Sequence, residues 1–367
     1  MPQASSLVLS YSNGITSCKD VQKGVSLYGL SDWVEISEVS RVSSSQAIHI
    51  ATESGLFVSG LPDTKIQIIE DGSPTVTSFK SLKVGQELRY NQDTVSFEAL
   101  ANIGFVPNDE VRQRAERDVY LPSIMTDDLA RLIGWIEGDA NISEDGVALC
   151  GPSSDPDKFE YYLSSFERIF QVTRGKVTKR SDSILSTTVG SILIRDWFKY
   201  INARSCREDS VPYCILASGT SVWQNYLIGL FETDGSLGDS GHGDGVYVPR
   251  LKQAGKIRMA QIAFLLNLLG IGVRLDERKS ENKDHQTLYD CVIRGRRSRA
   301  LFYDLIGKHL VADKKRERSK TGIGDAEDSS TEVDKISDIK ASSDGKVFIN
   351  LTPSSKDFYL CNSLYLR

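Results

Sequence analysis

The stretch LIGLFETDGSLG, residues 227–238, is an apolar run that ends in Glu232, Asp234 and a glycine. An earlier stretch, LIGWIEGDANIS at residues 132–143, repeats the same order of apolar residues, glutamate and aspartate. Three positions match at a constant offset of 95 residues: Gly134 with Gly229, Glu137 with Glu232, and Asp139 with Asp234. Because solenoid repeats are only about 20 to 50 residues long, this offset predicts two similar subdomains instead.

Each stretch reads as a helix whose apolar face packs against the other copy. Carboxylates avoid burial unless they are paired, so the presence of acids directly after each apolar run requires an explanation. Gly134 and Gly229 would let the two backbones approach closely, and Asp139 and Asp234 would then emerge together at one end. We expect the two glutamates of the repeat to be structural or capping residues. For either aspartate, a role in simply ending a packed helix is the alternative.

Composition places few limits on function. The chain has 367 residues, 40% of them hydrophobic and 25% charged, with a net charge of −5. Residues 251–320 nevertheless hold 17 Lys and Arg against 8 Asp and Glu, which favours a polyanionic partner. No run approaches the roughly 20 apolar residues of a membrane span, and the N-terminus lacks the pattern of a signal peptide. We therefore expect a cytoplasmic protein with no membrane contact.

The order of apolar patterns predicts an α+β fold. Residues 1–115 read as short strands separated by turns. Residues 120–320 read as two halves, about 125–215 and 216–320, each with the order helix, two strands, helix, two strands, helix. The polar segment 313–335 reads as a linker, and residues 335–367 return to short strands. These last strands are too few for a domain of their own, so we expect them to complete the β domain begun by residues 1–115, with the middle domain inserted into it.

The paired stretches resemble the two signature helices of LAGLIDADG homing endonucleases. The flanking regions resemble the Hint fold of inteins. Residues 210–216 and 266–275 are similar to sequence motifs that recur in the intein branch. The resemblance covers nearly the whole chain; one departure is Ala140, where a final glycine is usual. It implies a duplicated αββαββα core inserted in an all-β Hint-like domain.

The Hint-like flanks lack the groups that protein splicing requires. Met1 stands where an intein has a nucleophilic Cys or Ser, and Leu61 and Thr64 occupy the stretch that normally presents Thr and His. The chain ends in Leu366 and Arg367, where an intein ends in His-Asn. The resemblance therefore implies a freestanding, splicing-dead relative of an intein.

By the same resemblance, the middle domain is a site-specific endonuclease that cuts double-stranded DNA at a long target. Asp139 and Asp234 would hold Mg²⁺, which prefers oxygen ligands and retains several waters. Both halves lie on one chain, which implies a monomer. The family also uses a basic residue in each half. Lys314 is the catalytic candidate in the second half and Lys315 a candidate DNA contact, although either could exchange roles or be a solvated lysine.

The first half departs from the family at this point. Asp209 stands where the intein branch usually has a lysine, with Arg207 nearby. Because this lysine is missing, the sequence does not predict that the second DNA strand is cut. Nicking of a single strand remains an alternative to a double-strand cut.

DNA recognition would fall to the strands of the two halves and their edges. Arginine can hold guanine in a bidentate contact, whereas lysine mostly contacts phosphate. The candidates are Lys176, Lys179, Arg180, Arg274, Arg278, Arg294, Arg296, Arg297 and Lys315. The glycine-rich segment 238–250 is a candidate DNA-ordered loop.

Two other functions are compatible with the sequence. A catalytically inactive DNA- or RNA-binding protein, similar to an intron maturase or a regulator, would be favoured by the missing lysine and opposed by the presence of both aspartates. Active protein splicing is opposed by the residues at both ends of the chain.

Overall fold

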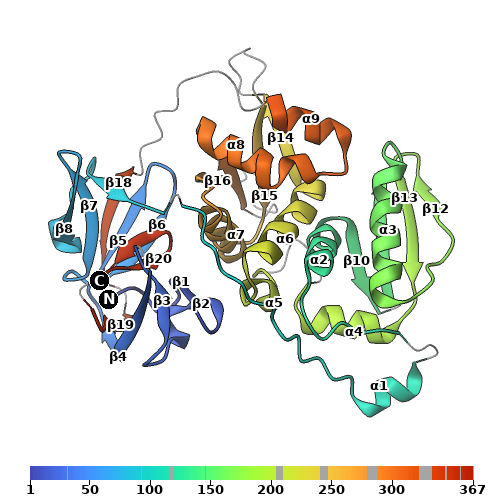
Figure 1. The fold of residues 1–367 in the computed structure, drawn as a ribbon, viewed down its shortest axis with the longest axis horizontal. Coiled ribbons are helices and arrows are strands. Elements are labelled where there is room, and N and C mark those ends of the chain that lie inside the picture. The colour runs from blue at the N-terminus through green and yellow to red at the C-terminus, as the bar shows by residue number, and fades with distance from the viewer. Residues whose placement is uncertain are drawn as a thin grey trace.

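Two helices at the centre of the molecule, α2 (Asp127–Asp139) and α6 (Thr220–Thr233), pack directly against each other (Figure 1). Thr126 starts α2, because its Oγ1 accepts a hydrogen bond from the Leu129 N–H at 3.3 Å and so satisfies one of the free donors of the first turn. The predicted close approach at Gly134 is confirmed, since a Cβ atom there would overlap the Tyr226 carbonyl oxygen.

The computed structural model describes the chain except residues 31, 92, 116–118, 145, 204–209, 240–246, 279–286, 322–332, 344, 356 and 367.

Each central helix opens a unit with the predicted order of seven elements. The first unit continues from α2 with β10 (Ala140–Ser143), β11 (Gly146–Pro152), α3 (Pro156–Phe170), β12 (Thr178–Ser181), β13 (Ile184–Val189) and α4 (Ile192–Tyr200). The second continues from α6 with β14 (Gly235–Asp239), β15 (Tyr247–Gln253), α7 (Lys256–Leu268), β16 (Val273–Arg278), β17 (Leu288–Ile293) and α8 (Arg296–Leu305).

Each unit forms its own four-stranded antiparallel sheet. The strand orders are β10-β11-β13-β12 and β14-β15-β17-β16, so the two sheets have the same topology. Their registers also correspond, since Ala140 pairs with Leu149 in the first sheet and Gly235 with Leu251 in the second. In both units the strand after the central helix therefore starts one residue beyond the aspartate.

A third sheet draws its strands from both ends of the chain. Over the described residues it has 13 strands in the order β19-β4-β3-β1-β20-β21-β7-β9-β18-β5-β6, with β2 paired to β1 and β8 to β7. Both chain ends lie together in it (Figure 1). Its strands are β1 (Leu7–Ser10), β2 (Gly14–Ser17), β3 (Ser26–Tyr28), β4 (Trp33–Ser44), β5 (Ala47–Thr52), β6 (Phe57–Gly60), β7 (Lys65–Glu70), β8 (Ser73–Ser78), β9 (Glu87–Arg89), β18 (Val333–Ser342), β19 (Lys346–Pro353), β20 (Tyr359–Cys361) and β21 (Leu364–Leu366).

The large sheet is docked on the second unit through hydrogen bonds and a shared core. The Leu275 N–H of β16 donates to the Ser54 carbonyl oxygen at 2.8 Å, and the Asn267 side chain donates to Ser363 Oγ at 2.9 Å. Leu9 of β1 belongs to the same buried hydrophobic cluster as Trp223 of α6. The sheet and the helical core are therefore one packed body at this junction.

The prediction of a linker over residues 313–335 is wrong at both of its ends. Residues Asp313–Thr321 form helix α9, and residues 333–335 begin β18. Helix α9 has no apolar stripe, and for that reason its sequence reads as a solvated segment. It packs against α8 and the 3₁₀ turn before it, where buried Ser319 lies against Gly307.

The remaining elements are short. They are α1 (Asp109–Arg114), α5 (Tyr213–Leu216) and the 3₁₀ turns η1 (Cys18–Asp20), η2 (Phe79–Ser81) and η3 (Gly307–His309). Across the described part of the chain, no helix combines the length and the apolar character needed to cross a lipid bilayer.

Candidate active site

The C-terminal ends of α2 and α6 meet, and each carries one of the predicted aspartates. Asp139 is the last residue of α2, and Asp234 is the residue that caps α6. A Cβ atom added to Gly138 would lie 3.2 Å from Asp234 Oδ1 and would overlap the Thr233 side chain. Both helix ends carry partial negative charge from their unpaired carbonyls, so two carboxylates placed here concentrate negative charge that only nearby cations can offset.

Asp139 is half-buried and lies in a mixed electrostatic environment. Burial raises the pKa of its carboxyl to about 6; the positive charge of Lys158 opposes this shift, and the negative charge of Asp234 adds to it. Lys315 is the second cation that acts on Asp139. A divalent ion at this position would favour the ionised carboxylate, because opposite charge nearby lowers a carboxyl pKa.

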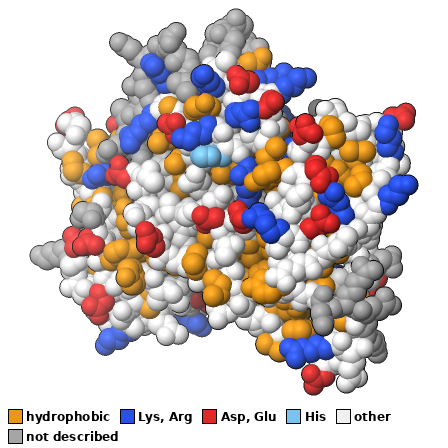
Figure 2. Space-filling view, turned by 45° about the vertical axis from the view of Figure 1, so that its right-hand side comes forward, with side chains coloured by type: hydrophobic (Ala, Val, Ile, Leu, Met, Phe, Trp, Pro, Cys, Tyr) orange, Lys and Arg blue, Asp and Glu red, His pale blue; other side chains and the backbone are white. Residues whose placement is uncertain are grey.

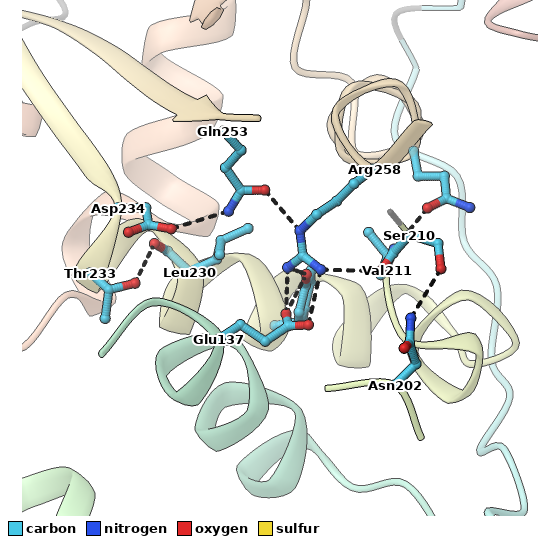
Figure 3. A network of polar contacts seen from close by, with 11 residues as sticks. Glu137, Asn202, Ser210, Val211, Leu230, Thr233, Asp234, Gln253 and Arg258 are labelled. Carbon is cyan, nitrogen blue, oxygen red and sulfur yellow. Dashed lines mark hydrogen bonds and ion pairs between the residues drawn. The ribbon is translucent and has the colours of Figure 1, made fainter. Parts of the chain in front are cut away.

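Asp234 is oriented by an amide. The Gln253 side chain, at the end of β15, donates from Nε2 to Asp234 Oδ2 at 3.2 Å and accepts at Oε1 from Arg258 Nε at 2.8 Å (Figure 3). Gln253 is itself buried. Since both ends of the amide are engaged, its orientation is fixed, and the Asp234 carboxylate has a defined partner.

Behind this amide lies a fully buried ion pair. Arg258 donates from Nη2 and Nη1 to the two carboxylate oxygens of Glu137, at 2.6 and 3.0 Å. The Tyr226 hydroxyl donates to Glu137 Oε2 at 2.8 Å. Burial raises the pKa of Glu137, whereas Arg258 lowers it. The structural role expected for this glutamate is confirmed, and it joins the first unit to the second.

Glu232 also has a structural role. Its carboxylate accepts hydrogen bonds from the backbone N–H groups of Val311 and Ala312, at 2.7 and 3.0 Å. The glutamate thus holds the chain just before α9 against the end of α6. This contact sets where the following lysines lie.

Lys315, and not Lys314, reaches the site. Its Nζ donates to the carbonyl oxygens of Phe231, Glu232 and Thr233 at 2.9, 2.7 and 3.3 Å. These carbonyls have no partner within the helix because they belong to its last turn. Burial lowers the pKa of Lys315 to about 8. Lys314 lies on the exposed side of α9.

The sequence reasoning missed Lys158, Gln253 and Arg258. Lys158 is 6% exposed and lies in the first turn of α3, with its Nζ 3.5 Å from the Glu232 carbonyl oxygen. Arg258 has the same place in the first turn of α7. A basic residue at the third position of both helices is the signal that the sequence offered.

One family comparison covers this part of the chain. Residues 222–307 match the model of the LAGLIDADG-like domain. The match runs from the first turns of α6 to just beyond α8, and it includes Asp234, Gln253 and Arg258. No curated protein matches the chain.

Several solved structures align with the chain at low similarity. A structure of mesophilic variants of the homing endonuclease I-DmoI has a TM-score of 0.37 and 17% identity, covering 50% of this chain and 97% of that one. The homing endonuclease I-WcaI bound to its DNA recognition sequence has a TM-score of 0.40 and 15% identity, covering 61% and 96%. The gp41-1 intein has a TM-score of 0.22 and 14% identity, covering 24% and 66%.

The candidate DNA contacts fall into three groups. Lys176, Lys179 and Arg180 are exposed on β12 and just before it. Arg274 and Arg278 lie on β16, where each is held by an acid: Arg274 by Asp276 at 2.7 Å and Arg278 by Asp290 at 2.9 Å. The third group, Arg294, Arg296 and Arg297, lies between β17 and the first turn of α8, so Arg296 and Arg297 are helical instead of extended.

Basic side chains also gather on the surface around α8 and α9. On the face drawn in Figure 2, Lys and Arg are concentrated in the upper part, where Figure 1 places α8 and α9. Lys308, Lys314, Arg318 and Lys320 are exposed there. Arg318 also lies over the ring of Tyr247 at 5.0 Å.

Some predicted residues cannot be placed. Arg207, Asp209, Arg367 and most of segment 238–250 lie outside the described residues. Within the described residues, no group of three or more His, Cys, Asp or Glu side chains gathers as a metal site would. A metal ion bound at the meeting helix ends would therefore have two carboxylates as protein ligands, and water or phosphate oxygens would complete its coordination shell.

Proposed function

We propose that this protein is a site-specific endonuclease that hydrolyses phosphodiester bonds of double-stranded DNA with the help of a divalent cation. The observation that carries the proposal is the meeting of Asp139 and Asp234 at the ends of two packed helices, with the amines of Lys158 and Lys315 alongside. The match of residues 222–307 to the LAGLIDADG-like domain supports it.

The residues at the helix ends fit a hard divalent cation. Two carboxylates supply the oxygen donors that Mg²⁺ prefers, and a pair leaves room for waters and phosphate oxygens in its coordination shell. We propose Asp139 and Asp234 as the protein ligands and Mg²⁺ as the ion. Bound there, the ion would supply an activated water and offset charge on the leaving oxygen.

Lys315 takes the basic role for which Lys314 was the sequence candidate. Three helix carbonyls fix its amine beside the carboxylate pair. An amine held in place is suited to contact a phosphate oxygen or to orient the attacking water. Lys314, on the exposed side of the same helix, is suited to contact phosphates farther along the duplex.

The two four-stranded sheets are the proposed DNA-reading surfaces. Two similar sheets on one chain suit a long target bound by a monomer, with the exposed Lys176, Lys179 and Arg180 on one sheet and Arg278 on the other. Arg294, Arg296, Arg297 and Arg274 are proposed to contact phosphates or base edges at the margins. An enzyme acting on genomic DNA works inside the cell, so we propose a cytoplasmic location.

We further propose that residues 1–115 and 335–367 form a Hint-like domain without splicing activity, and that residues 120–320 form the endonuclease domain. Support for the first part is that strands from both ends of the chain share one sheet. Met1 offers a thioether in place of a nucleophilic thiol or hydroxyl. Fusing foreign segments to both ends tests this point, because a ligated product of the two segments would contradict it.

A plasmid library with a randomised insert tests the nuclease proposal. Wild-type protein with Mg²⁺ is expected to cut or nick a small set of inserts, and sequencing the cut ends gives the target. Asp139→Asn and Asp234→Asn should abolish cutting while retaining DNA binding, and EDTA should do the same. An inactive DNA- or RNA-binding protein would bind nucleic acid without cutting it. Cutting that survives both substitutions would place the active site elsewhere.

A further inference from the structure

The chain between β9 and α1 includes a stretch, residues 94–101, that crosses the start of α6 in an extended form. Val95 and Phe97 are buried, whereas Ser96 and Glu98 are exposed, and this alternation is the period of two of an extended backbone. In Figure 1 the chain leaves the large sheet and runs past α5 toward α1. This stretch, the strap, therefore lies over the second unit with one row of side chains facing solvent.

One edge of the strap is bonded to the second unit. The Thr220 N–H donates to the Phe97 carbonyl oxygen at 2.8 Å, and the Gly219 N–H donates to the Ala99 carbonyl oxygen at 2.8 Å. The Phe97 N–H donates to Thr220 Oγ1 at 3.0 Å. These bonded groups all belong to odd-numbered residues of the strap. Because successive residues of an extended chain direct their backbone groups to opposite edges, the even-numbered residues direct theirs away from these partners.

The other edge of the strap is open. Within the described part of the chain, the backbone N–H and C=O groups of Ser96, Glu98 and Leu100 form no hydrogen bond. All three residues are exposed, so a second chain can approach this edge. A row of free N–H and C=O groups is a template for an added strand.

A groove of about 570 Å³ follows the strap, beside the first turns of α2 and α6. Among the described residues that line it, the charged ones are Glu98 and Asp127, and no Lys or Arg is present. Leu100, which is 63% exposed, adds an apolar contact at one end of the groove. Because complementary charge favours association and like charge opposes it, the groove fits a cationic segment that also carries apolar residues.

We propose that the strap is a docking site for an extended segment of another protein that contains lysine or arginine and adds as a strand to the open edge. Each even-numbered residue of the strap exchanges an N–H and a C=O bond with the partner residue opposite it. The basic residue of the partner lies opposite Glu98. A second copy of this chain fits poorly, because antiparallel pairing of two straps about their centres places the two Glu98 carboxylates opposite each other.

The strap lies at the opposite end of the central helices from the aspartates. It contacts the N-terminal ends of α2 and α6, whereas Asp139 and Asp234 lie at their C-terminal ends. A partner docked on the strap therefore leaves the aspartates uncovered. The docking site is independent of the proposed endonuclease function, and its test needs no DNA.

The probe for the test is a fluorescein-labelled synthetic peptide, Thr-Val-Thr-Lys-Thr-Val-Thr, titrated with the full chain and followed by fluorescence anisotropy. One matched peptide carries Glu in place of Lys. Another carries Pro in place of both Val residues, which removes two of the N–H groups that pairing requires. The wild type should bind the Lys peptide at least about fivefold more tightly than the Glu peptide and at least about tenfold more tightly than the Pro peptide.

Glu98→Lys should reverse the preference, so that this variant binds the Glu peptide more tightly than the Lys peptide. The matched control is Glu70→Lys, which makes the same change of charge at an exposed position of β7 in the large sheet and should bind all three peptides as the wild type does. The comparison of the Lys and Pro peptides uses unchanged protein, so its result does not depend on the folding of a variant.

Three results would overturn the proposal: no binding of the Lys peptide, equal binding of the Lys and Glu peptides, or equal binding of the Lys and Pro peptides. Sedimentation velocity of the wild type adds a fourth, because a dimer that Leu100→Asp dissociates would mean that a second copy covers the open edge. Each of these results leaves the endonuclease function standing. Conversely, a protein that cuts no DNA but binds the peptides in the expected order keeps the docking site.

Discussion

Gly134 and Gly229 meet backbone to backbone at the contact between α2 and α6. A Cβ atom on Gly134 would lie 3.2 Å from the Gly229 carbonyl carbon and 2.8 Å from the Leu230 nitrogen. A Cβ atom on Gly229 would lie 2.8 Å from the Trp135 nitrogen and would overlap the Arg131 carbonyl oxygen. The atoms in the way are backbone atoms, so side-chain rotation cannot relieve the overlap.

We therefore predict that Gly134→Ala or Gly229→Ala forces the helices apart and lowers the free energy of unfolding by about 2 to 4 kcal/mol. Urea unfolding followed by circular dichroism measures the loss. The matched control is Gly345→Ala, because a Cβ atom at Gly345 meets nothing within 4 Å. If both variants unfold at the same urea concentration as wild type, the two helices do not pack as closely as the structure indicates.

Glu137 and Arg258 give a second prediction for stability. Glu137→Leu or Arg258→Met leaves an uncompensated charge in a fully buried position, which costs about 3 to 5 kcal/mol. The double variant Glu137→Leu with Arg258→Met removes both charges, so it should be more stable than Arg258→Met alone. Urea unfolding of the three variants makes the comparison. Additive losses in the double variant would contradict a direct pairing.

Lys315 predicts a dependence of stability on pH. Burial lowers its pKa from 10.5 to about 8. Between these two values the unfolded chain binds the proton and the folded chain does not, so the free energy of unfolding rises with pH over this window. Below pH 8 both states carry the proton, and the cost of burying the charge is fully present.

The rise attributable to Lys315 is on the order of 3 kcal/mol. We expect the free energy of unfolding of wild type to rise relative to that of Lys315→Met between pH 8 and pH 10.5, whatever the difference that the lost hydrogen bonds of Lys315 cause at pH 7.5. Urea unfolding at intervals of one pH unit would show it. Lys320→Met, at an exposed position of the same helix, should follow the wild-type profile. Parallel curves for wild type and Lys315→Met would show that this amine is not buried as described.

The repeat in the sequence predicted the elements around the site because helix period, capping and strand alternation are local properties. Thr126, for example, precedes the first helix and caps it. The offset of 95 residues also predicted that the two aspartates emerge at the same end. By contrast, α9 was read as a linker, since its residues show no apolar period and its position depends on contacts with α8 and β15.

The support around the aspartates could not be predicted because it depends on pairs far apart in the chain. Arg258 lies 121 residues from Glu137, and no pattern within either stretch indicates that they pair. In the sequence, Lys158 is indistinguishable from other lysines on amphipathic helices, because its contact with the end of α6 is made only in the folded chain. For the same reason, the sequence could not distinguish Lys315 from Lys314; the direction of each side chain is set by how Glu232 holds the start of α9.

The large β sheet and the segment of residues 94–97 that follows β9 are predicted to contribute to the stability of the helical core. Trp223 of α6 stacks on Phe97, with ring centroids 5.8 Å apart, and Phe97 also contacts Trp33 of β4. The Val95 N–H donates to the Leu268 carbonyl oxygen at 2.7 Å. A fragment that omits these segments exposes the apolar surface they cover and leaves backbone acceptors of the second unit without partners.

A fragment of residues 120–320 should therefore unfold at a lower urea concentration than the whole chain or aggregate. A fragment of residues 94–321 keeps Phe97 against Trp223, so it should recover part of the loss. Near-ultraviolet circular dichroism during urea unfolding follows the tryptophan environment directly. If the shorter fragment unfolds at the same urea concentration as the whole chain, the shared core contributes nothing to the stability of the helices, and the sheet is a separable appendage.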